Sequence, residues 1–236
     1  FTLQALMKFL TAFLNNGRKN LKWHERNLFF AATLLIIILN IVLYAALGGS
    51  WKINTQVSSP RWNAFLYFKA LIQTFLNAFL HFNWQHTLLN MLCFAVCGIY
   101  LERKTGTLNF FLLILGFAFF TSCAVAANNE SINFRGFSGV NFALYSYIIL
   151  DYLFCTIPKN KRTRLNTVYG GVMLALVYLA MCFSGGTSKF TFSWYPYDLF
   201  YNLGHYTSFF SGAIITLSLK LVILATEKKL LRKNDG

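Results

Sequence analysis

The sequence predicts an all-α membrane protein, built as a bundle of six transmembrane helices with both the N-terminus and the C-terminus in the cytoplasm. Of its 236 residues, 56% are hydrophobic and only 12% are charged, whereas soluble domains carry about 25% charged residues. Six long apolar runs follow one another along the chain, and the basic residues gather in loops that a six-helix arrangement places on one side. Together these observations indicate a protein that lies in a lipid bilayer.

Each of the six apolar runs is long enough, or nearly so, to cross the membrane. A spanning helix needs roughly 20 mostly apolar residues. The first run is too long, and starts too far along the chain, to be the hydrophobic part of a signal peptide. The predicted spans are Asn27–Leu47, His86–Leu101, Leu108–Ala127, Ser138–Ile157, Thr167–Phe183 and Gly204–Ala225.

A further apolar run, Trp62–Leu80, is ambiguous because Lys69, Gln73 and Asn77 interrupt it. Loop charge resolves the ambiguity, since basic residues favour the cytoplasmic side of a membrane. With six spans, the cytoplasmic side receives the basic clusters within 8–26, 103–104, 159–164 and 228–233, and a seventh span would move three of these clusters outside. We therefore expect Trp62–Leu80 to lie in or on the outer leaflet.

The chain divides into three predicted parts. Residues 1–26 carry an apolar stripe at helical spacing, which predicts a cytoplasmic or interfacial amphipathic segment. Residues 27–225 form the six-helix membrane domain, whose first outer loop, 48–85, is partly embedded in the membrane. Residues 226–236 form a basic cytoplasmic tail. Such a multi-pass protein is expected in the cell membrane, plasma or inner, and the sequence leaves its oligomeric state open.

Charge and cysteine usage argue against several other classes of protein. The net charge of +14 is spread over short clusters between apolar runs rather than along one face, so we expect no nucleic-acid partner. The five cysteines all fall inside apolar runs, where cysteine acts as a small packing residue. Without a metal-ligand cluster or a glycine-rich phosphate loop, the sequence predicts no metal and no cofactor. Partners are therefore expected within the lipid bilayer.

Four polar residues stand out because they lie at or inside predicted spans, where polar groups are energetically costly and commonly functional. His86 and Asn90 are one helical turn apart, so both side chains lie on one helix face. Ser138 opens the fourth predicted span, and His205 lies at the start of the sixth. All four lie near the outer ends of their helices, and we expect them to meet just below the outer surface.

Ser138 and His205 suggest nucleophilic catalysis. A serine hydroxyl is a weak nucleophile until a neighbouring base removes its proton, and histidine is a suitable base. The carboxylates within and at the end of the predicted spans, Asp151 and Glu102, fall toward the inner ends of their helices. We therefore expect a Ser–His dyad without a third, acidic member.

The tetrahedral oxyanion of acyl transfer needs preorganised hydrogen-bond donors. The backbone N–H of Ser138, at a positive helix N-terminus, is a suitable donor, and so are the side chains of His86 and Asn90. Gly136 and Gly139 lie on either side of the serine, and glycine permits both a close backbone approach and an irregular loop before the helix. These residues therefore favour acyl transfer.

Taken together, these residues resemble the rhomboid family of intramembrane serine proteases. The resemblance covers the chain from about residue 27 to residue 225. It implies a rhomboid-like bundle in which Ser138 is the nucleophile and His205 is the general base. The match depends on three motifs in chain order, His81…His86…Asn90, Gly136-Phe137-Ser138-Gly139 and Gly204-His205.

The resemblance also assigns supporting roles. It implies that His86, Asn90 and the Ser138 amide line the oxyanion hole. It places His81 near the outer mouth of the site. It implies that Phe142, four residues after the serine, packs its aromatic ring against the general base.

Outside the proposed dyad, the chain both keeps and departs from the family pattern. Glu102 matches a structural acidic position. Ile72-Gln73 stands where the family commonly has Trp-Arg, and Ser208 and Gly212 stand in a ladder of small residues that the family builds from glycine. Small residues let helices approach closely, so we expect the sixth predicted span to pack tightly on the fourth.

The sequence supports one main function and two alternatives. The main hypothesis is a protease that hydrolyses peptide bonds of transmembrane protein substrates near the outer membrane face. Because a helical peptide bond is shielded by its own hydrogen bonds, we expect substrates with Gly, Pro or other poor helix formers near the cleaved bond. The alternatives are a catalytically inactive rhomboid-fold protein that binds membrane helices, and a transporter that uses the inner charges Asp151 and Lys220.

Overall fold

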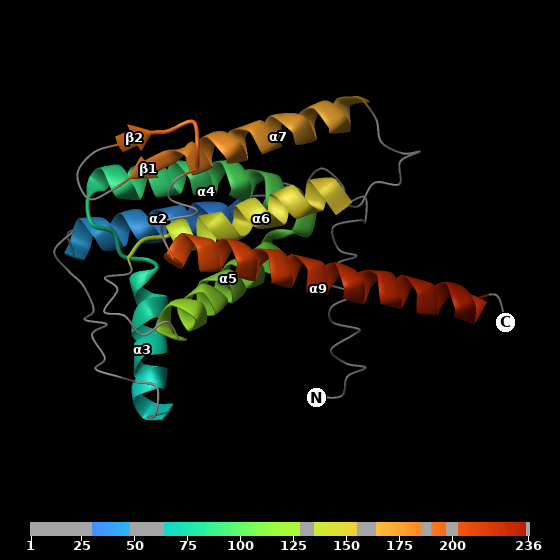
Figure 1. The fold of residues 1–236 in the computed structure, drawn as a ribbon, viewed down its shortest axis with the longest axis horizontal. Coiled ribbons are helices and arrows are strands. Elements are labelled where there is room, and N and C mark those ends of the chain that lie inside the picture. Colours follow the sequence, from blue (N-terminus) through green and yellow to red (C-terminus); the bar gives the residue numbers. More distant parts are fainter. Residues whose placement is uncertain are drawn as a thin grey trace.

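The computed structural model describes residues 30–47, 64–127, 135–154, 164–185, 190–196 and 203–234. These residues form seven helices and one short antiparallel hairpin (Figure 1). The helices are α2 (Ala31–Leu47), α3 (Ala64–Asn77), α4 (Trp84–Thr105), α5 (Thr107–Ala127), α6 (Ser138–Phe154), α7 (Arg164–Cys182) and α9 (Leu203–Asn234), and the strands are β1 (Phe183–Gly185) and β2 (Phe190–Phe192). The predicted helical architecture is confirmed. The hairpin is a small addition within a predicted outer loop.

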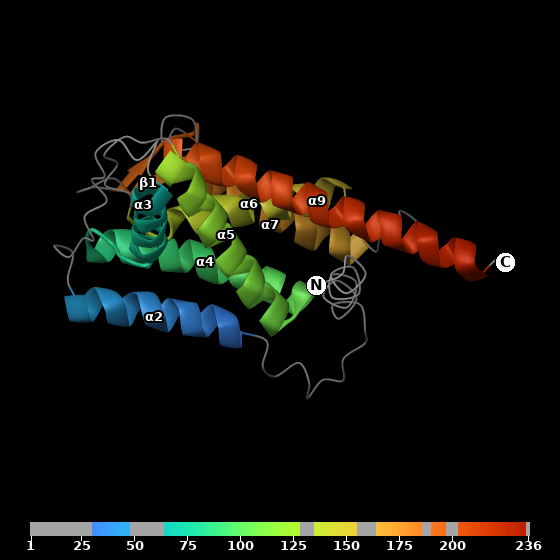
Figure 2. The ribbon, with the colours of Figure 1, turned by 90° about the horizontal axis from the view of Figure 1, so that it is seen from below.

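Helices α2, α4, α6, α7 and α9 run alongside one another, α5 crosses them obliquely, and these six helices alternate in direction along the chain, whereas α3 lies across them (Figures 1 and 2). We call the end of the bundle where α4, α6 and α9 begin the Ser138 end. The other end, where α2 begins and where α4 and α6 finish, is the Glu102 end. The crossing helix α3 falls within Trp62–Leu80, the run that the loop charges had set apart from the spans.

Local signals explain where α4 starts and stops. It starts earlier than the predicted span because Asn83 caps it, with the side-chain oxygen accepting the His86 backbone N–H at 2.7 Å. It stops at Gly106, whose φ of 86° is a conformation that glycine adopts readily. The Gly106 N–H donates to the Glu102 carbonyl at 2.8 Å.

The last helix is longer than predicted. No glycine or proline follows Gly212 until Gly236, and α9 continues to Asn234, through most of the stretch assigned above to a basic tail. The predicted amphipathic segment 1–26 lies outside the described residues.

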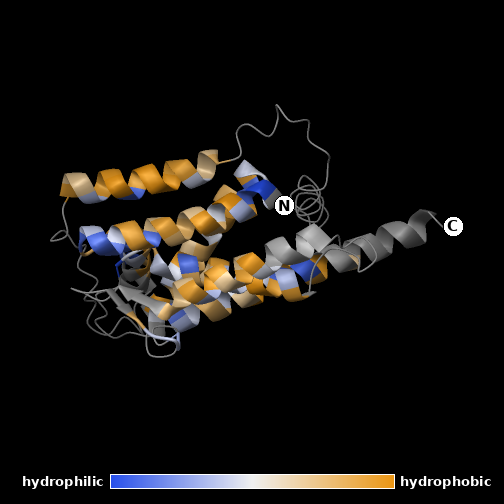
Figure 3. Cartoon of the chain, turned by 90° about the horizontal axis from the view of Figure 1, so that it is seen from above, coloured by the Kyte–Doolittle hydropathy of each residue, from blue (hydrophilic) through white to orange (hydrophobic). Residues whose placement is uncertain are grey.

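Many large apolar side chains of the described helices are exposed. Figure 3 shows hydrophobic residues along much of the coloured part of the helices. By length and composition alone, Trp84–Arg103 is the described segment that could cross a membrane, and Ala31–Leu47, Thr107–Cys123 and Gly171–Cys182 are apolar but shorter. Exposed apolar side chains in such numbers suit contact with lipid or another partner. Exposed large apolar side chains include those of Leu34, Leu88, Leu92, Leu108, Phe120, Ile214 and Leu221.

An aromatic core holds the segment that precedes Ser138. The Phe137 side chain is fully buried. Its ring meets the Phe94 ring edge-on, with 5.0 Å between centroids, and lies 5.6 Å from the Phe79 ring. Phe94 in turn stacks on Phe110 of α5. These contacts anchor the start of α6 to α4 and to the turn after α3.

The two helices that carry Ser138 and His205 pack along each other. A Cβ atom built on Gly212 of α9 would lie 2.5 Å from both the Ala143 carbonyl oxygen and the Ser146 Oγ of α6. Only glycine fits this contact, so the tight packing expected from the small residues is present. Ser208 and Thr216, on the same helix, are also buried.

Candidate active site

The structure brings Ser138 and His205 together, although 67 positions separate them in the chain. Ser138 is the first residue of α6, and His205 lies in the first turn of α9. The His205 Nε2 atom lies 2.8 Å from the Ser138 Oγ atom, within the range of a strong hydrogen bond. When Nε2 is the unprotonated nitrogen, the serine hydroxyl donates to it, as a nucleophile donates to its base.

Phe142 fixes the plane of the His205 ring. It lies one turn after Ser138 on α6, and its ring stacks on the imidazole with 4.3 Å between centroids and 16° between planes. A stacked aromatic face also attracts a cation. The contact therefore suits a histidine that gains a proton during a reaction.

Gly136 shapes the turn that leads into Ser138. Its φ is 111°, which an L side chain rarely adopts, and a Cβ built on it would lie 2.5 Å from the His86 Cε1 atom. Its N–H donates to the Asn77 carbonyl at 3.1 Å. This glycine lets the backbone turn and lets the His86 ring lie directly against it. Gly139 is buried in the first turn of α6.

His81 supports the same turn through a hydrogen bond to its backbone. The resemblance implies a place near the outer mouth of the site, and the His81 side chain is only 1% exposed. Its Nε2 accepts the Phe137 backbone N–H at 3.3 Å. Burial, with a smaller effect from neighbouring His86, lowers the pKa of the His81 imidazole to about 3. His81 is therefore a neutral acceptor that holds Phe137, the residue before Ser138.

His86 and Asn90 lie on successive turns of α4, close to the start of α6. The His86 ring contacts Gly136 and lies edge-on to the His81 ring, with 5.2 Å between centroids. Asn90 is buried, and its Nδ2 donates to the His86 carbonyl at 2.9 Å. A carboxamide nitrogen carries two hydrogens, so this bond uses only one of them.

Asn141 is a site residue that the sequence reasoning left out. It lies one turn after Ser138 and is buried. Its Nδ2 donates to the Asn90 backbone carbonyl at 3.0 Å and to the Asn90 Oδ1 at 3.3 Å. The second bond turns the Asn90 oxygen toward Asn141 and thereby fixes which way the Asn90 NH₂ points. Its spacing from Ser138 was the available signal, but one amide in an apolar helix is commonly only interhelical packing.

Arg135 forms a second contact that the sequence did not indicate. Its guanidinium carbon lies 3.9 Å from the centroid of the Phe82 ring, the geometry of a cation–π interaction. Phe82 in turn lies 5.7 Å from the His86 ring. This contact joins the segment before Ser138 to the segment before α4, on the side where the two histidines lie.

The carboxylates Glu102 and Asp151 do not reach this site. Glu102 accepts hydrogen bonds from the Ala32 and Thr33 backbone N–H groups and from the Thr33 hydroxyl. Asp151 pairs with Lys220. Among the described residues, no group of three or more His, Cys, Asp or Glu side chains is arranged to hold a metal ion. Asp198 and Glu130 lie outside those residues.

Comparison with known families and proteins gives one match. The family model of the rhomboid domain matches residues 69–222, which include every residue of the site described above. Neither curated proteins nor solved structures give a significant match. Rhomboid proteins are embedded in membranes and are in general serine proteases that act on transmembrane substrates there. The match covers well over half of the chain, and the protein therefore belongs to the rhomboid family.

Proposed function

We propose that the protein is an intramembrane serine protease that hydrolyses transmembrane protein substrates near the outer membrane face. Ser138 and His205 form its catalytic dyad. The observation that carries the proposal is the 2.8 Å contact between the His205 Nε2 and the Ser138 Oγ. Hydroxyl and imidazole groups are expensive to bury in a membrane protein, and this pair is brought together from two distant helices.

The reaction starts at the serine hydroxyl. As Ser138 Oγ attacks the carbonyl carbon of the substrate, His205 Nε2 takes the hydroxyl proton and becomes an imidazolium. The tetrahedral intermediate then collapses, the C–N bond breaks, and the leaving amine receives that proton from His205. Water attacks the resulting ester by the same route, releases the carboxylic acid and restores the Ser138 hydroxyl.

We assign three donors to the oxyanion. The first is the Ser138 backbone N–H, since the first N–H groups of a helix have no acceptor within the helix. The second is the remaining N–H of the Asn90 carboxamide, and the third is an N–H of His86. Donors of this type typically contribute about 100- to 1,000-fold in rate each.

Both carboxylates already bond other groups, which supports a dyad without an acidic third member. Glu102 caps the start of α2, and Asp151 is paired with Lys220. Neither is left to orient His205, and Phe142 supplies a stacking contact for that ring instead. The same ion pair weakens the transporter hypothesis, because the two inner charges on which transport would depend lie 3.0 Å from each other.

Substrate preference follows from the need to unwind a helix. The carbonyl of a helical peptide bond is hydrogen-bonded within its own helix, so Ser138 gains access only where the substrate helix opens. Gly and Pro disfavour helix by about 1 and 3 kcal/mol. We therefore propose substrates that carry such residues near the cleaved bond, with small residues just before it.

The membrane topology is also a proposal. We assign residues 27–225 to a domain with six spans, with the segments 1–26 and 226–236 and both termini in the cytoplasm of a cell whose plasma or inner membrane holds the protein. The alternating directions of the helices and the transverse position of α3 support this arrangement (Figure 2). Accessibility of single cysteines placed in 48–61 and in 159–163 tests it, with outside labelling expected only for the first.

Labelling of Ser138 by a fluorophosphonate tests the activity. We expect labelling of the wild-type protein in membranes and complete loss in Ser138→Ala and His205→Ala. Ser122→Ala is the matched control, since Ser122 is a buried serine of α5 that bonds the Ala118 carbonyl, and it should label normally. Cleavage of a panel of transmembrane reporters provides the second measurement.

A folded wild-type protein that neither labels nor cleaves any reporter contradicts the proposal. Retained binding of membrane helices would then point to the inactive rhomboid-fold alternative. The presence of both dyad residues in bonding contact argues against that outcome.

A further inference from the structure

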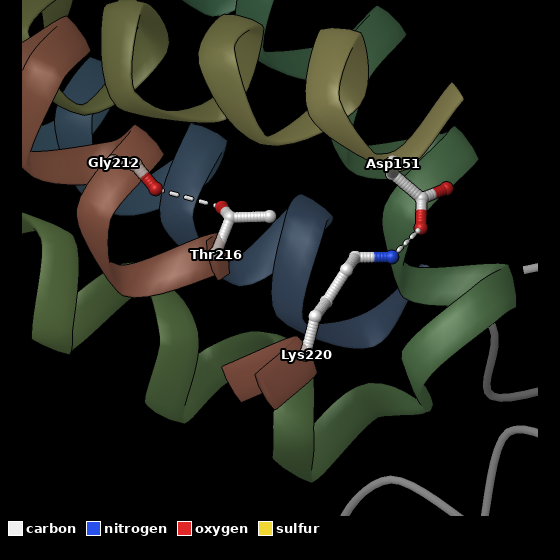
Figure 4. Close-up of polar contacts among 4 residues, drawn as sticks. All are labelled: Asp151, Gly212, Thr216 and Lys220. Carbon is white, nitrogen blue, oxygen red and sulfur yellow. Dashed lines mark hydrogen bonds and ion pairs between the residues drawn. The ribbon is translucent and has the colours of Figure 1, made fainter. Parts of the chain in front are cut away.

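A buried ion pair links the two helices that carry the dyad. The Lys220 Nζ of α9 lies 3.0 Å from the Asp151 Oδ1 of α6, and the two side chains are 14% and 4% exposed (Figure 4). The proposed mechanism does not use either residue. Both lie about 20 Å from the dyad along their helices, at 1.5 Å per residue.

Stability alone is a weak reason to keep this pair. Two charges lose their hydration when they are buried, and replacing a buried pair with apolar residues of similar volume is often neutral or stabilising. Ionisable residues within membrane helices commonly mark a functional requirement. The best-attested requirement for buried polar groups is to fix the register of packed helices.

The interface between α6 and α9 needs a contact that fixes the register of the two helices. Its α9 face presents small residues at every fourth position, Gly204, Ser208, Gly212 and Thr216, all buried. The hydroxyls bond their own helix: Thr216 Oγ1 donates to the Gly212 carbonyl at 2.7 Å (Figure 4). Such faces allow close approach, but they offer few large side chains that interlock. Lys220 is the next residue in the same series, and there the small residues end.

We propose that Asp151 and Lys220 are positioning residues that set the axial register of α9 against α6, and with it the contact between His205 and Ser138. The two helices run in parallel, so a slide at the pair moves the dyad by the same amount. A slide of one residue is 1.5 Å, and a misplacement of about 1 Å can lower a catalytic rate about 100-fold. The catalytic consequence rests on the proposed function, whereas the register itself does not.

Four variants separate register from stability. Asp151→Asn and Lys220→Met each break the pair. Asp151→Leu/Lys220→Met replaces it with apolar contacts, and Asp151→Lys/Lys220→Asp reverses it. For each, the rate of fluorophosphonate labelling of Ser138 is measured per folded molecule in native membranes, beside the temperature of unfolding. Glu102→Gln is the control, because it removes a buried charge at the same end without touching the α6–α9 interface.

We expect each single variant to label about 10- to 100-fold more slowly than the wild type. The reversed pair should label at least about tenfold faster than the single variants. The apolar double variant should unfold at or above the wild-type temperature and still label slowly. Glu102→Gln should unfold earlier and label at the wild-type rate per folded molecule. A wild-type labelling rate in the apolar double variant, or no recovery in the reversed pair, overturns the proposal.

A distance measurement keeps the register testable without any activity. Spin labels are placed at Leu153→Cys on α6 and Leu221→Cys on α9, both exposed positions near the pair, in a background without the five native cysteines. Pulsed electron resonance should give one narrow distance with the ion pair and a shifted or broader distribution with the apolar pair. An unchanged distribution overturns the register. If the wild type fails to label but the distribution changes, the proposed protease activity fails and the register stands.

Discussion

The two ends of the bundle satisfy their buried polar groups in different ways. At the Ser138 end, the partners are imidazoles, carboxamides, a hydroxyl and backbone N–H groups. At the Glu102 end, they are carboxylates and an ammonium: Glu102 holds the start of α2, and Asp151 pairs with Lys220. Apart from the Arg135 guanidinium over the Phe82 ring, uncharged side chains thus hold the candidate active site, and charged side chains hold the opposite end.

This difference corresponds to two different tasks. A base that takes up a proton must start uncharged, and donors to a transient oxyanion must not already be paired with a fixed negative charge, so neutral groups suit the Ser138 end. Groups that fix one helix to another never change, and a full charge gives the strongest bonds for that purpose, about 1.5–3 kcal/mol for a hydrogen bond to a charged group. Changes at the Ser138 end should therefore lower rates directly. At the other end, loss of the Glu102 carboxylate should lower stability, and changes to the Asp151–Lys220 pair should act on the rate only through the register of α9 on α6.

The largest effect is expected for Gly136→Ala. The new Cβ would lie 2.5 Å from the His86 Cε1, in a backbone conformation with φ at 111°, so the imidazole or the turn before Ser138 must move. Such a displacement of an oxyanion donor should lower the rate of reporter cleavage about 100-fold or more. Steady-state cleavage in detergent or in liposomes measures it.

Gly116→Ala is the matched control for that change. Gly116 lies in the middle of α5, and a Cβ built on it would meet nothing within 4 Å. Replacing a helical glycine with alanine should raise the free energy of unfolding by about 0.5–1 kcal/mol and leave cleavage unchanged. Equal cleavage rates in the two alanine variants would contradict the role given to Gly136.

Glu102→Gln should have the largest effect at the opposite end. The carboxylate accepts from two backbone N–H groups and from the Thr33 hydroxyl, at 2.6–3.0 Å, and it lies at the positive N-terminus of α2. Its loss should lower the free energy of unfolding by about 2–3 kcal/mol, without a change in cleavage rate per folded molecule. Thr33→Val removes one of the three bonds and should cost about 1 kcal/mol. A lower cleavage rate per folded molecule of Glu102→Gln would contradict the difference proposed between the two ends.

His81 predicts a pH effect on stability at the Ser138 end. Its folded pKa of about 3 lies below the ordinary value of about 6.5, so the unfolded chain binds the proton more readily. The contribution of neutral His81 to the free energy of unfolding is therefore complete above pH 6.5. It is lost as the pH falls toward 3, and at pH 5 the free energy of unfolding is lower by about 2 kcal/mol. His81→Gln keeps an acceptor for the Phe137 N–H but does not titrate, so its unfolding free energy should fall less steeply. Parallel slopes for the two proteins would refute this.

The helical fold and the candidate pair Ser138 and His205 can be predicted from the sequence because their signals are strong and local. Long apolar runs identify the helices. Loop charge distinguishes Trp62–Leu80 from the predicted spans, and α3, which falls within this run, lies across the other helices. The serine and the histidine each lie at a helix start, which brings them to one end once the helix directions alternate.

What the sequence missed are contacts between side chains on different elements. The sequence did not indicate that His81 is buried, with its acceptor nitrogen bonded to the Phe137 N–H. The Arg135 guanidinium lies over the Phe82 ring, although the two residues are 53 positions apart in the chain. Which amide meets which carbonyl across two helices depends on their relative rotation and depth, and an apolar pattern fixes neither to within one residue.

Asn141 gives the smallest predicted effect and the most specific one, because it acts through a second residue. Asn141→Leu removes the N–H group that donates to the Asn90 Oδ1 at 3.3 Å. Without this hydrogen bond the Asn90 amide can rotate, so it presents its remaining N–H to the oxyanion less often. Cleavage should slow about tenfold, through kcat rather than KM, since this bond acts in the transition state. Asn109→Leu, which removes a buried amide at the opposite end, should leave kcat unchanged. A matching loss in both variants would mean that Asn141 serves only general packing.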